Sequence, residues 1–387
     1  MLLTIPDSKL LNPAKLSERK AKLRLIAYGM SILVFIFVLY QLFTVIFLRD
    51  TTAGSPKDFS GSYFYNPYQK QSWKDASEKV ALHIHSDQVW YTPERHSQKD
   101  IESVYRKNGF SVLSFTDYDQ IPEEGRLETQ LSGYEWGRNL RKRHAIIIGS
   151  KKTTSDFFPF YARRDNVSWT FREMRETGGY VIIAHPKLND SFTKDDLIHI
   201  QNYNAVEVYS PFGDDAKILD TLLSKGRDVH CMASDDLHYL PESITKSLGQ
   251  PGWKDLLQTV LLQRGREGES LKRYIATASG ETNPQSVRAD LGAGAFYCIK
   301  KHFREAEDPK LPNIQIDQKG FVKLESKERF LEIRWIGKNG EIKKIDPDTN
   351  ASFYQFTDQD SYIRLEILAL TGSILSNAIY RTDNPKN

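Results

Sequence analysis

The feature that most constrains this chain is an uncharged, strongly apolar stretch near its start, at residues 25–48. As a helix rising about 1.5 Å per residue it would be roughly 36 Å long, enough to cross a hydrocarbon core of about 30 Å. A buried soluble helix would show a polar stripe, and a signal peptide would show a shorter apolar core and a small-residue cleavage site. The stretch has neither, which predicts a retained transmembrane helix.

Basic residues are concentrated in front of this stretch, at the positions Lys9, Lys15, Arg19, Lys20, Lys22 and Arg24. Few follow it directly, so the positive-inside rule predicts a cytoplasmic segment 1–24, a signal-anchor helix 25–48 and an extracytoplasmic remainder, periplasmic or at the cell surface. The whole chain is nearly balanced, with 53 basic and 50 acidic residues. A duplex nucleic acid is therefore not an expected partner.

The chain has two cysteines, Cys231 and Cys298, and both follow the apolar stretch. A disulfide is permitted outside the cytoplasm, but two cysteines make no framework. A buried reduced pair is the simpler interpretation, and the sequence leaves the redox state open.

Residues 49–78 are rich in Gly, Ser, Pro and aromatic residues without a sustained period, which predicts a tether. After it, apolar runs rich in β-branched residues alternate with stretches of helical spacing. The runs lie at residues 80–85, 111–116, 131–136, 144–149, 180–186, 205–209 and 229–234. The helical stretches lie at 100–107, 169–177, 194–201 and 215–225, with Gly109, Gly178 and Gly226 as expected C-caps. This alternation implies parallel pairing, so the α/β fold is a barrel or a doubly wound sheet.

The last part of the chain has a different texture. Apolar and polar residues alternate from about residue 312, and Lys338-Asn-Gly-Glu is typical of a tight hairpin. We expect residues 312–387 to form a small, antiparallel, sandwich-like β domain. Residues 239–311 are assigned to the closing helices of the barrel and a linker, with helices expected at 253–263 and 270–276.

Two short patterns place possible metal ligands at strand ends. His83 and His85 are two residues apart at the end of the first run, so both side chains project from one face. Asp236 and His238 share a face in the same way after the last run. Alone, an H-x-H pair is weak evidence, because chance or surface histidines produce it often.

Three further residues fall at strand ends as well. Glu135 ends the third run, His144 begins the fourth and His185 ends the fifth. In a parallel α/β barrel the carboxyl ends of the strands converge on one rim, which hosts the active site. The remaining histidines have a simpler interpretation as surface or packing residues: His96, His199, His230 and His302.

Imidazoles mixed with carboxylates suit zinc, manganese or iron, and the lack of clustered cysteines argues against a structural zinc site. A carboxylate shared by two divalent ions about 3.5 to 4 Å apart would hold a bridging water and lower its pKa. Glu135 is the candidate bridge, and Glu135, Asp236 and His185 are the predicted catalytic residues. Such a site hydrolyses phosphoesters.

Six motifs occur in order between residues 78 and 240: His83-Ile-His85-Ser, Phe115-Thr-Asp-Tyr-Asp119, Gly133-Tyr-Glu135, Gly178-Gly-Tyr-Val-Ile-Ile-Ala-His-Pro186, Glu207-Val-Tyr and Ala233-Ser-Asp-Asp-Leu-His238. Together they resemble the motifs of the PHP (polymerase and histidinol phosphatase) superfamily. The resemblance implies a distorted seven-stranded β/α barrel over residues 79–311, with two or three metal ions and usually phosphoester hydrolysis. The ending Ser-Asn-Ala-Ile-Tyr also resembles the β tail of the branch named after the carbaryl hydrolase.

Carried over residue by residue, the resemblance gives the two metal ions the ligands His83, His85, Glu135 and Asp236 for one, and Glu135, His144 and His185 for the other. Asp235 competes with Asp236 for the aspartate role, because the doubled acid blurs the match. His238 corresponds to a ligand of the third ion that the family often holds.

The third position departs from the family pattern. Tyr118 stands where a histidine usually follows Thr-Asp, and the loop at residues 87–96 lacks the usual Ser-Asp-Gly. A tyrosine is a poor ligand while protonated, and its reference pKa is about 10. The sequence therefore predicts two ions with the third site weakened. His96, Asp87 or Asp119 are possible substitutes, although solvated loop residues are the simpler interpretation.

Four basic residues near the motifs are candidates to hold an anionic substrate, with solvated surface charge as the alternative: Arg95, Arg138, Arg143 and Lys187. The predicted function is a membrane-anchored, metal-dependent phosphoesterase acting on a small phosphorylated molecule or nucleotide. A catalytically weakened PHP-like binding or scaffold protein and a metal-dependent esterase or amidase remain as alternatives. Neither the substrate nor the oligomeric state follows from fold-level resemblance.

Overall fold

The computed structural model describes residues 13–51, 56–69, 78–92, 94, 96–121, 130–240, 270–277 and 283–384. The chain divides into two compact units, Met1–Arg49 and Asp50–Asn387. In the first unit, helix α1 (Pro13–Phe47) contains the predicted span almost completely. Within its portion Ser17–Phe47, a window of 18 residues has a mean hydropathy of 2.5, so the helix is long and apolar enough to cross a membrane. A signal sequence near an N-terminus passes the same test.

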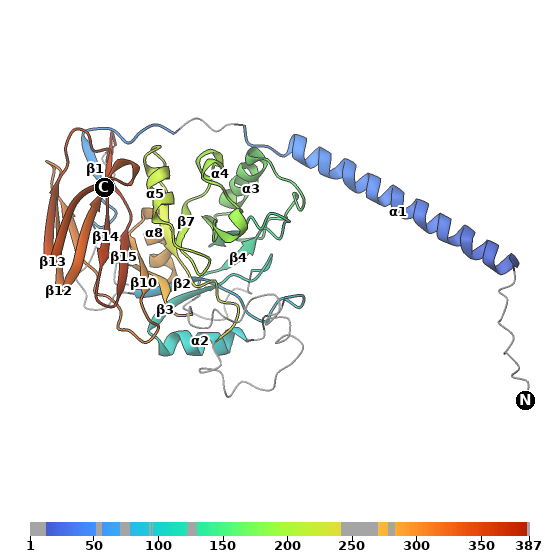
Figure 1. Cartoon of the computed structure of the whole chain (residues 1–387), viewed down its shortest axis with the longest axis horizontal. Coiled ribbons are helices and arrows are strands. Elements are labelled where there is room, and N and C mark those ends of the chain that lie inside the picture. The colour runs from blue at the N-terminus through green and yellow to red at the C-terminus, as the bar shows by residue number, and fades with distance from the viewer. Residues whose placement is uncertain are drawn as a thin grey trace, which may run out of the picture. The chain divides into compact units, whose positions relative to one another are not determined.

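The second unit has a mixed α/β architecture built on two sheets (Figure 1). The five-stranded sheet has the order β4 (Gly133–Trp136), β5 (Ala145–Ile148), β6 (Tyr180–Ile183), β7 (Ala205–Tyr209) and β8 (His230–Ala233). The eleven-stranded sheet contains β1 (Tyr63–Tyr65), β2 (Glu78–Ile84), β3 (Phe110–Phe115), β9 (Arg273–Thr277), β10 (Phe296–Lys301), β11 (Asn313–Ile316), β12 (Phe321–Ile336), β13 (Ile342–Gln355), β14 (Tyr362–Leu368), β15 (Gly372–Ser376) and β16 (Ile379–Thr382).

The seven predicted strand runs coincide with β2 to β8, which confirms an α/β fold. These strands belong to two separate sheets, so their ladders do not close a seven-stranded barrel. Single parallel bridges do join the two groups of strands, at Tyr118–Glu135 between the residues after β3 and strand β4, and at Ile84–Leu237 between β2 and the residues after β8.

Uniform parallel pairing was a wrong prediction for β5. This strand is antiparallel to both of its neighbours, β4 and β6. Only residues 137–144 connect β4 to β5, and a parallel crossover needs a dozen residues or more. Because β5 runs in the opposite direction, its first residues lie at the same edge as the carboxyl ends of β4 and β6. His144, which directly precedes β5, is thereby placed beside Glu135 and His185.

The four predicted helices are present as α2 (Gln98–Lys107), α3 (Arg164–Glu176), α4 (Lys194–His199) and α5 (Ala216–Leu223). A further helix, α8 (Pro284–Ala293), and two short 3-10 helices, η1 (Leu188–Asp190) and η3 (Lys338–Gly340), complete the described helices. Gly226 follows α5 with a φ of 71°, and a Cβ there would lie 1.8 Å from the carbonyl oxygen of Lys57. Glycine is therefore required at this helix end.

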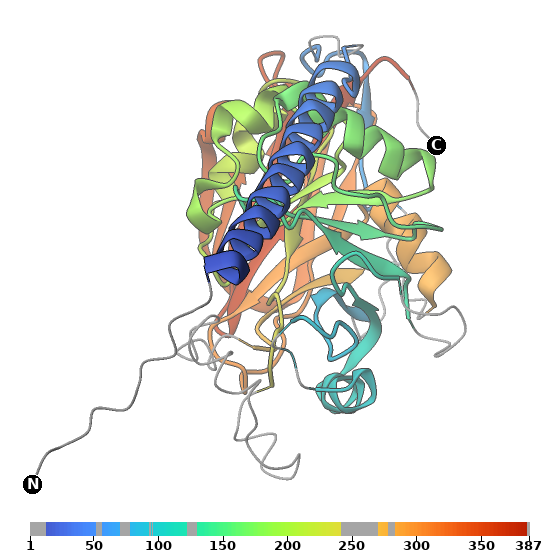
Figure 2. The same cartoon turned by 90° about the vertical axis from the view of Figure 1, so that its right-hand side faces the viewer.

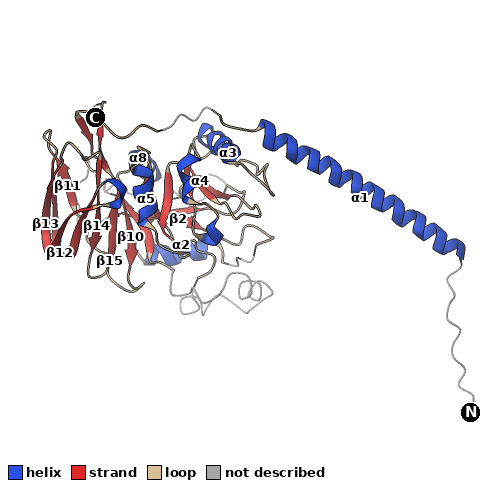
Figure 3. Ribbon diagram, turned by 45° about the horizontal axis from the view of Figure 1, so that its top comes forward, coloured by secondary structure: helices blue, strands red, loops and turns tan. Residues whose placement is uncertain are grey.

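The helices cover different sides of the second unit. In Figures 1 and 2, α2 lies at the bottom while α3 and α4 lie at the top. Apolar residues of α3, α5 and α8 pack on the five-stranded sheet, whereas Ile101 and Tyr105 of α2 join a second core with β2, β3 and the C-terminal strands. Figure 3 shows those C-terminal strands gathered on the side away from α3 and α4.

The helix expected at residues 270–276 is wrong, because Arg273–Thr277 forms strand β9. This strand pairs with β2 on one side and β10 on the other, and all five of its residues are buried. Pairing on both edges outweighs a local helical pattern. The helix expected at 253–263 lies outside the described residues.

The predicted hairpin at Lys338-Asn-Gly-Glu is confirmed: η3 connects β12 to β13, and Asn339 and Gly340 have φ values of 60° and 74°. The strands of this tail continue the larger sheet, because β15 pairs with β10. Strands at the two ends of the second unit thus share one hydrogen-bonded sheet.

The two cysteines form a disulfide, so the simpler interpretation as a reduced pair was wrong. Cys231 lies in β8 and Cys298 in β10, with their Cα atoms 6.3 Å apart. Both side chains are fully buried. The bond therefore ties the five-stranded sheet to the eleven-stranded one.

Candidate metal centre

Four predicted ligands from three strand ends come together in one buried cluster. His83 and His85 come from the end of β2, Glu135 from β4 and Asp236 from the residues after β8. Each offers one donor atom, and these atoms lie within 4.8 Å of one another. Glu135, His144 and His185 form a second group that meets the same limit. Glu135 belongs to both groups.

The two oxygens of Glu135 face different groups. Its Oε2 lies 3.0 Å from Nε2 of His85 and 3.6 Å from Nε2 of His83. Its Oε1 lies 2.6 Å from Nδ1 of His144 and 3.4 Å from Nε2 of His185. This arrangement suits a carboxylate that bridges two cations.

Asp236 also lies between the groups. Its Oδ1 is 2.9 Å from Nε2 of His83, and its Oδ2 is 3.9 Å from Nε2 of His185. Asp236 and His185 have positive φ values, 45° and 26°, which residues other than glycine rarely adopt. Such backbone strain clusters at functional sites, where surrounding contacts hold it in place.

The donor set fits divalent metal ions. All six side chains are buried. The following buried atoms make no hydrogen bond to any residue that the structure describes: Nε2 of His83 and His85, both oxygens of Glu135, Nδ1 of His144 and Oδ1 of Asp236. Buried polar atoms without a hydrogen bond are costly and rare, so their convergence indicates a ligand. Mixed imidazole and carboxylate donors suit zinc, manganese or iron.

The charges of the cluster favour ionised carboxylates. Burial raises the pKa of Glu135, but His144 and the neighbouring imidazoles outweigh it and hold this pKa well below its usual range. The pKa of Asp236 is lowered in the same way, against burial, by His83 and His238. Burial lowers the pKa of His83, but Asp236 and Glu207 outweigh it and raise this pKa well above its usual range. Protons and metal ions therefore compete for this site.

Glu207 of β7 positions the ligands and was missed as a functional residue. Its Oε1 accepts hydrogen bonds from Nδ1 of His83 at 2.8 Å and from Oγ of Ser234 at 2.5 Å. Its Oε2 accepts from the backbone N–H of His185 at 2.7 Å. Because Nδ1 of His83 donates to Glu207, Nε2 is left to face the cluster. The only sequence signal for this role was the Glu207-Val-Tyr motif.

Tyr118 lies beside the cluster, with its ring stacked on His85 at 4.9 Å. Burial, together with Glu135 and Asp236, raises the pKa of Tyr118 well above its usual range. The phenol therefore stays protonated and is a poor metal ligand. Among the described residues, neither donor group includes His96, Asp87 or Asp119.

His238 lies at the edge of the cluster. Its Nε2 is 3.2 Å from Oδ1 of Asp236, and its Nδ1 is 2.6 Å from Oε1 of Glu94. Burial opposes protonation of His238, but Asp236 and Glu94 raise its pKa to about 10. Glu94 was not predicted to have a role; of the same loop, Asp87 and His96 were the residues considered for the third position.

Asp235 faces away from both donor groups. Its carboxylate accepts hydrogen bonds from the backbone N–H groups of Lys272 and Arg273, each at 3.0 Å. Burial raises the pKa of Asp235 to about 7, against the opposing effect of Arg273. Of the doubled acid, Asp236 is the residue that the structure brings to the histidines.

The basic candidates for anion binding have different surroundings. Arg138 is half exposed, binds Asp119 at 2.6 Å and lies over the ring of Tyr91 at 4.6 Å. Arg143 is buried and donates to Asp196 and to backbone carbonyls. Lys187 donates to the carbonyl of Asp214. Arg95 lies outside the described residues.

No family model and no curated protein matches the chain. Seven chains of solved structures match. One is a two-domain protein from Bacteroides vulgatus that contains a predicted PHP-like metal-dependent phosphoesterase. The identity is 11%, the match covers 84% of this chain and 99% of that chain, and the TM-score is 0.43. We therefore base the proposed function on the side chains of the site.

Proposed function

We propose that this chain is a membrane-anchored, metal-dependent hydrolase that cleaves a phosphoester with two divalent ions. The observation that carries the proposal is the position of Glu135, whose two oxygens face two separate groups of buried histidines. A protein that only needed a stable core would fill this space with apolar side chains at lower cost.

The ligands of one ion are His83, His85, Glu135 and Asp236. The ligands of the other are Glu135, His144 and His185. Two divalent ions held here would supply a water of lowered pKa and would neutralise the charge of phosphoryl oxygens.

Other side chains orient these ligands or receive the substrate. Glu207 fixes the ring orientation of His83 and the backbone of His185. Arg138, half exposed beside Asp119, is the candidate to hold the phosphate of a small phosphorylated molecule or nucleotide. We assign β2 to β8 to one distorted barrel, in which the single bridges at Tyr118–Glu135 and Ile84–Leu237 connect the strands of the two sheets.

The same proposal places the second unit outside the cytoplasm, with helix α1 retained as the anchor. The basic residues before the apolar stretch support this orientation. The disulfide between Cys231 and Cys298 supports it independently, because such bonds persist in oxidising compartments.

Hydrolysis of an aryl phosphate by the full chain, purified in detergent, tests the activity. We expect turnover that disappears with a chelator and in His185→Ala, while His199→Ala, an exposed histidine of α4, keeps it. A protein that binds metal but hydrolyses no member of a broad panel of phosphate esters, carboxylate esters and amides would contradict the proposal. That result would favour the binding or scaffold alternative, which the protonated Tyr118 in the third position supports.

A further inference from the structure

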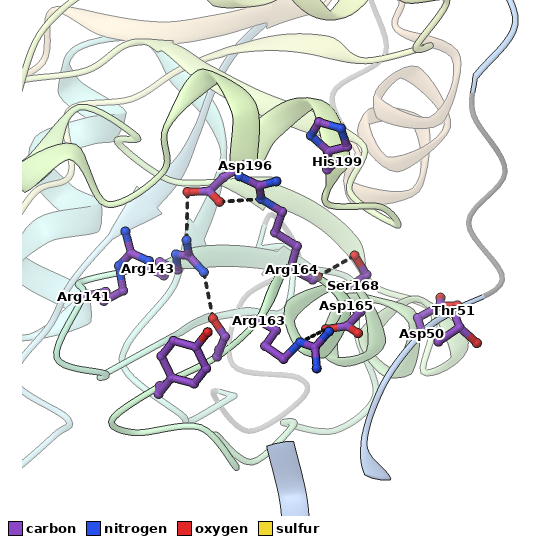
Figure 4. Close-up of a pocket in the computed structure, with 12 residues that line it drawn as sticks. Asp50, Thr51, Arg141, Arg143, Arg163, Arg164, Asp165, Ser168, Asp196 and His199 are labelled. Carbon is purple, nitrogen blue, oxygen red and sulfur yellow. Dashed lines mark hydrogen bonds and ion pairs between the residues drawn. The ribbon is translucent and has the colours of Figure 1, made fainter. Parts of the chain in front are cut away.

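A basic pocket of about 550 Å³ lies near α3 and α4. Its walls carry four arginines, Arg141, Arg143, Arg163 and Arg164, and the carboxylates of Asp50, Asp165 and Asp196 (Figure 4). The volume falls within the range of small-molecule sites, about 300 to 1,000 Å³. None of these residues belongs to either donor group of the candidate metal centre.

Two of the arginines are used within the protein. Asp196 accepts a hydrogen bond from Nη2 of Arg143 at 2.8 Å and one from Nε of Arg164 at 2.9 Å, as Figure 4 shows. Arg143 also donates to the carbonyls of Ser191 and Ala162. Arg143, Arg164 and Asp196 therefore form a hydrogen-bonded group in the wall of the pocket.

The other two arginines are available to a ligand. Arg163 is exposed, and Asp165, with its Oδ1 3.4 Å from Nε, is the acid that pairs with it among the described residues. Arg141 is exposed and forms no ion pair with any residue in the described part of the chain. Asp50 directs its carboxylate to Asn202 at 2.8 Å and to Arg172 at 3.5 Å, neither of which lines the pocket. The ligand-facing side of the pocket therefore has a net positive charge.

The place of Asp50 in the sequence determines what this pocket faces. Asp50 is only three residues beyond Phe47, the last residue of the apolar helix α1. Three residues reach at most about 11 Å when fully extended. The backbone N–H of Asp50 donates to the carbonyl of Asp165 at 2.9 Å, which fixes Asp50 at this pocket. If α1 spans a membrane, as the proposed function requires, the pocket lies at the surface of the bilayer.

Exposed apolar residues lie at the pocket or next to its lining residues in the chain: Tyr161 lines the pocket, Phe160 precedes Tyr161, and Leu140 precedes Arg141. Phe160 and Tyr161 are 54% and 58% exposed, and Leu140 is 73% exposed. The N–H of Leu140 donates to the carbonyl of Pro159, which holds the two segments side by side. Exposed aromatic and aliphatic residues beside arginines match the headgroup region, where apolar and charged groups of lipids meet.

We infer that this pocket binds the phosphate of an anionic phospholipid headgroup, with Arg141 and Arg163 as the ligand-contacting residues. The planar guanidinium binds phosphate oxygens through two parallel hydrogen bonds. The lipid chains remain in the bilayer while Leu140, Phe160 and Tyr161 contact the interface. The headgroup would then hold this face of the second unit against the membrane.

The test is native mass spectrometry of the full chain in detergent, titrated with phosphatidylglycerol, phosphatidylcholine or inorganic phosphate. We expect tight adducts with phosphatidylglycerol alone. In the double variant Arg141→Ala/Arg163→Ala, affinity should fall about fivefold per charge and about 25-fold in total, since a basic residue near an anionic surface contributes about 1 kcal/mol. The matched control is Lys151→Ala/Lys152→Ala, which removes two exposed charges from beyond the other end of β5.

The outcomes separate the alternatives. Equal adducts in wild type and the double variant would overturn the inference and assign the lipid to the apolar helix. Binding of inorganic phosphate as strong as that of phosphatidylglycerol would overturn it in favour of a small-anion site. Alkaline extraction of the full chain from membranes tests the anchor separately: release into the soluble fraction contradicts the anchoring part of the proposed function, whatever the pocket binds.

Discussion

Replacing Glu207 with glutamine isolates the contribution of the residues that orient the metal ligands. The carboxylate accepts three hydrogen bonds, from Nδ1 of His83, Oγ of Ser234 and the backbone N–H of His185. Glutamine keeps the shape, but its NH₂ group cannot accept. At least one of the three buried donors therefore loses its acceptor. Either the backbone N–H of His185 is left unpaired, or Nδ1 of His83 and Oγ of Ser234 are, and in that case His83 is no longer held in the tautomer that leaves Nε2 for a metal ion.

The expected loss of metal affinity in Glu207→Gln is about 10- to 100-fold, the usual effect of changing a group that orients a ligand. It corresponds to about 1.4 to 2.7 kcal/mol of binding free energy. A buried donor without an acceptor also costs about 1 to 3 kcal/mol of unfolding free energy. The substitution changes no residue of the two donor groups, so the number of metal ions bound at saturation should stay as in wild type.

The assay is competition between the full chain and chelators of graded strength, with retained metal measured by elemental analysis and unfolding followed in urea. Glu102→Gln is the matched control, because Glu102 is a partly buried glutamate of α2 that pairs with Arg106 and belongs to neither donor group. We expect its metal affinity to equal that of wild type. A folded Glu207→Gln protein with metal affinity within twofold of wild type would refute the positioning role of Glu207.

Three further predictions concern stability. Replacing Cys231 and Cys298 with serine opens a link across 67 residues and should lower the unfolding free energy by about 4 kcal/mol, read as a lower urea midpoint; an unchanged midpoint would show that the bond contributes nothing. Arg364→Met should cost about 3 to 5 kcal/mol, because it leaves the buried carboxylate of Asp220 without its bidentate partner; a neutral result in thermal unfolding would contradict this. Arg164 and Arg143 outweigh burial and lower the pKa of Asp196, so its contribution to the unfolding free energy is present above the ordinary pKa of 3.8 and is lost as the pH falls through the pKa of the folded state. The difference in unfolding free energy between wild type and Asp196→Asn should therefore close in acid, and a constant difference from pH 7 to pH 2 would count against this role.

Strands β2 to β8 could be predicted because each is a short apolar run rich in β-branched residues, and local pattern is enough to place such strands. Their hydrogen-bonded partners were harder. β5 pairs antiparallel because residues 137–144 leave no room for a crossover, a length that was readable in the sequence but was outweighed by the alternation of strands and helices. β9 was taken for a helix because its partners, β2 and β10, are distant in the sequence.

The candidate ligands could be named in advance because histidines and acids at strand ends form motifs. The residues that position these ligands could not be named from the sequence. Glu207 and Glu94 act through contacts with His83 and His238, and such contacts depend on how separate strands and loops pack. The disulfide was left open for the same reason, since nothing local to Cys231 or Cys298 shows that β8 and β10 face each other.

The accessibility of the arginines could not be predicted from the sequence either. Arg143 looked available because it precedes His144, but its guanidinium is buried against Asp196. Arg141, two residues earlier, was not singled out, yet it is one of two exposed arginines that line the pocket near α3 and α4. Sequence places a charge within a segment, while its accessibility follows from the packed structure.

The metal content of the full chain, purified in detergent without a chelator or a histidine tag, tests the two-metal site without depending on any substrate. We expect close to two equivalents of zinc, manganese or iron per chain, with a sharp fall in Glu135→Ala, because that residue belongs to both donor groups. Glu102→Ala serves as the control and should keep both ions. A folded protein that contains no metal, and takes up none when these ions are added, would contradict the binuclear site.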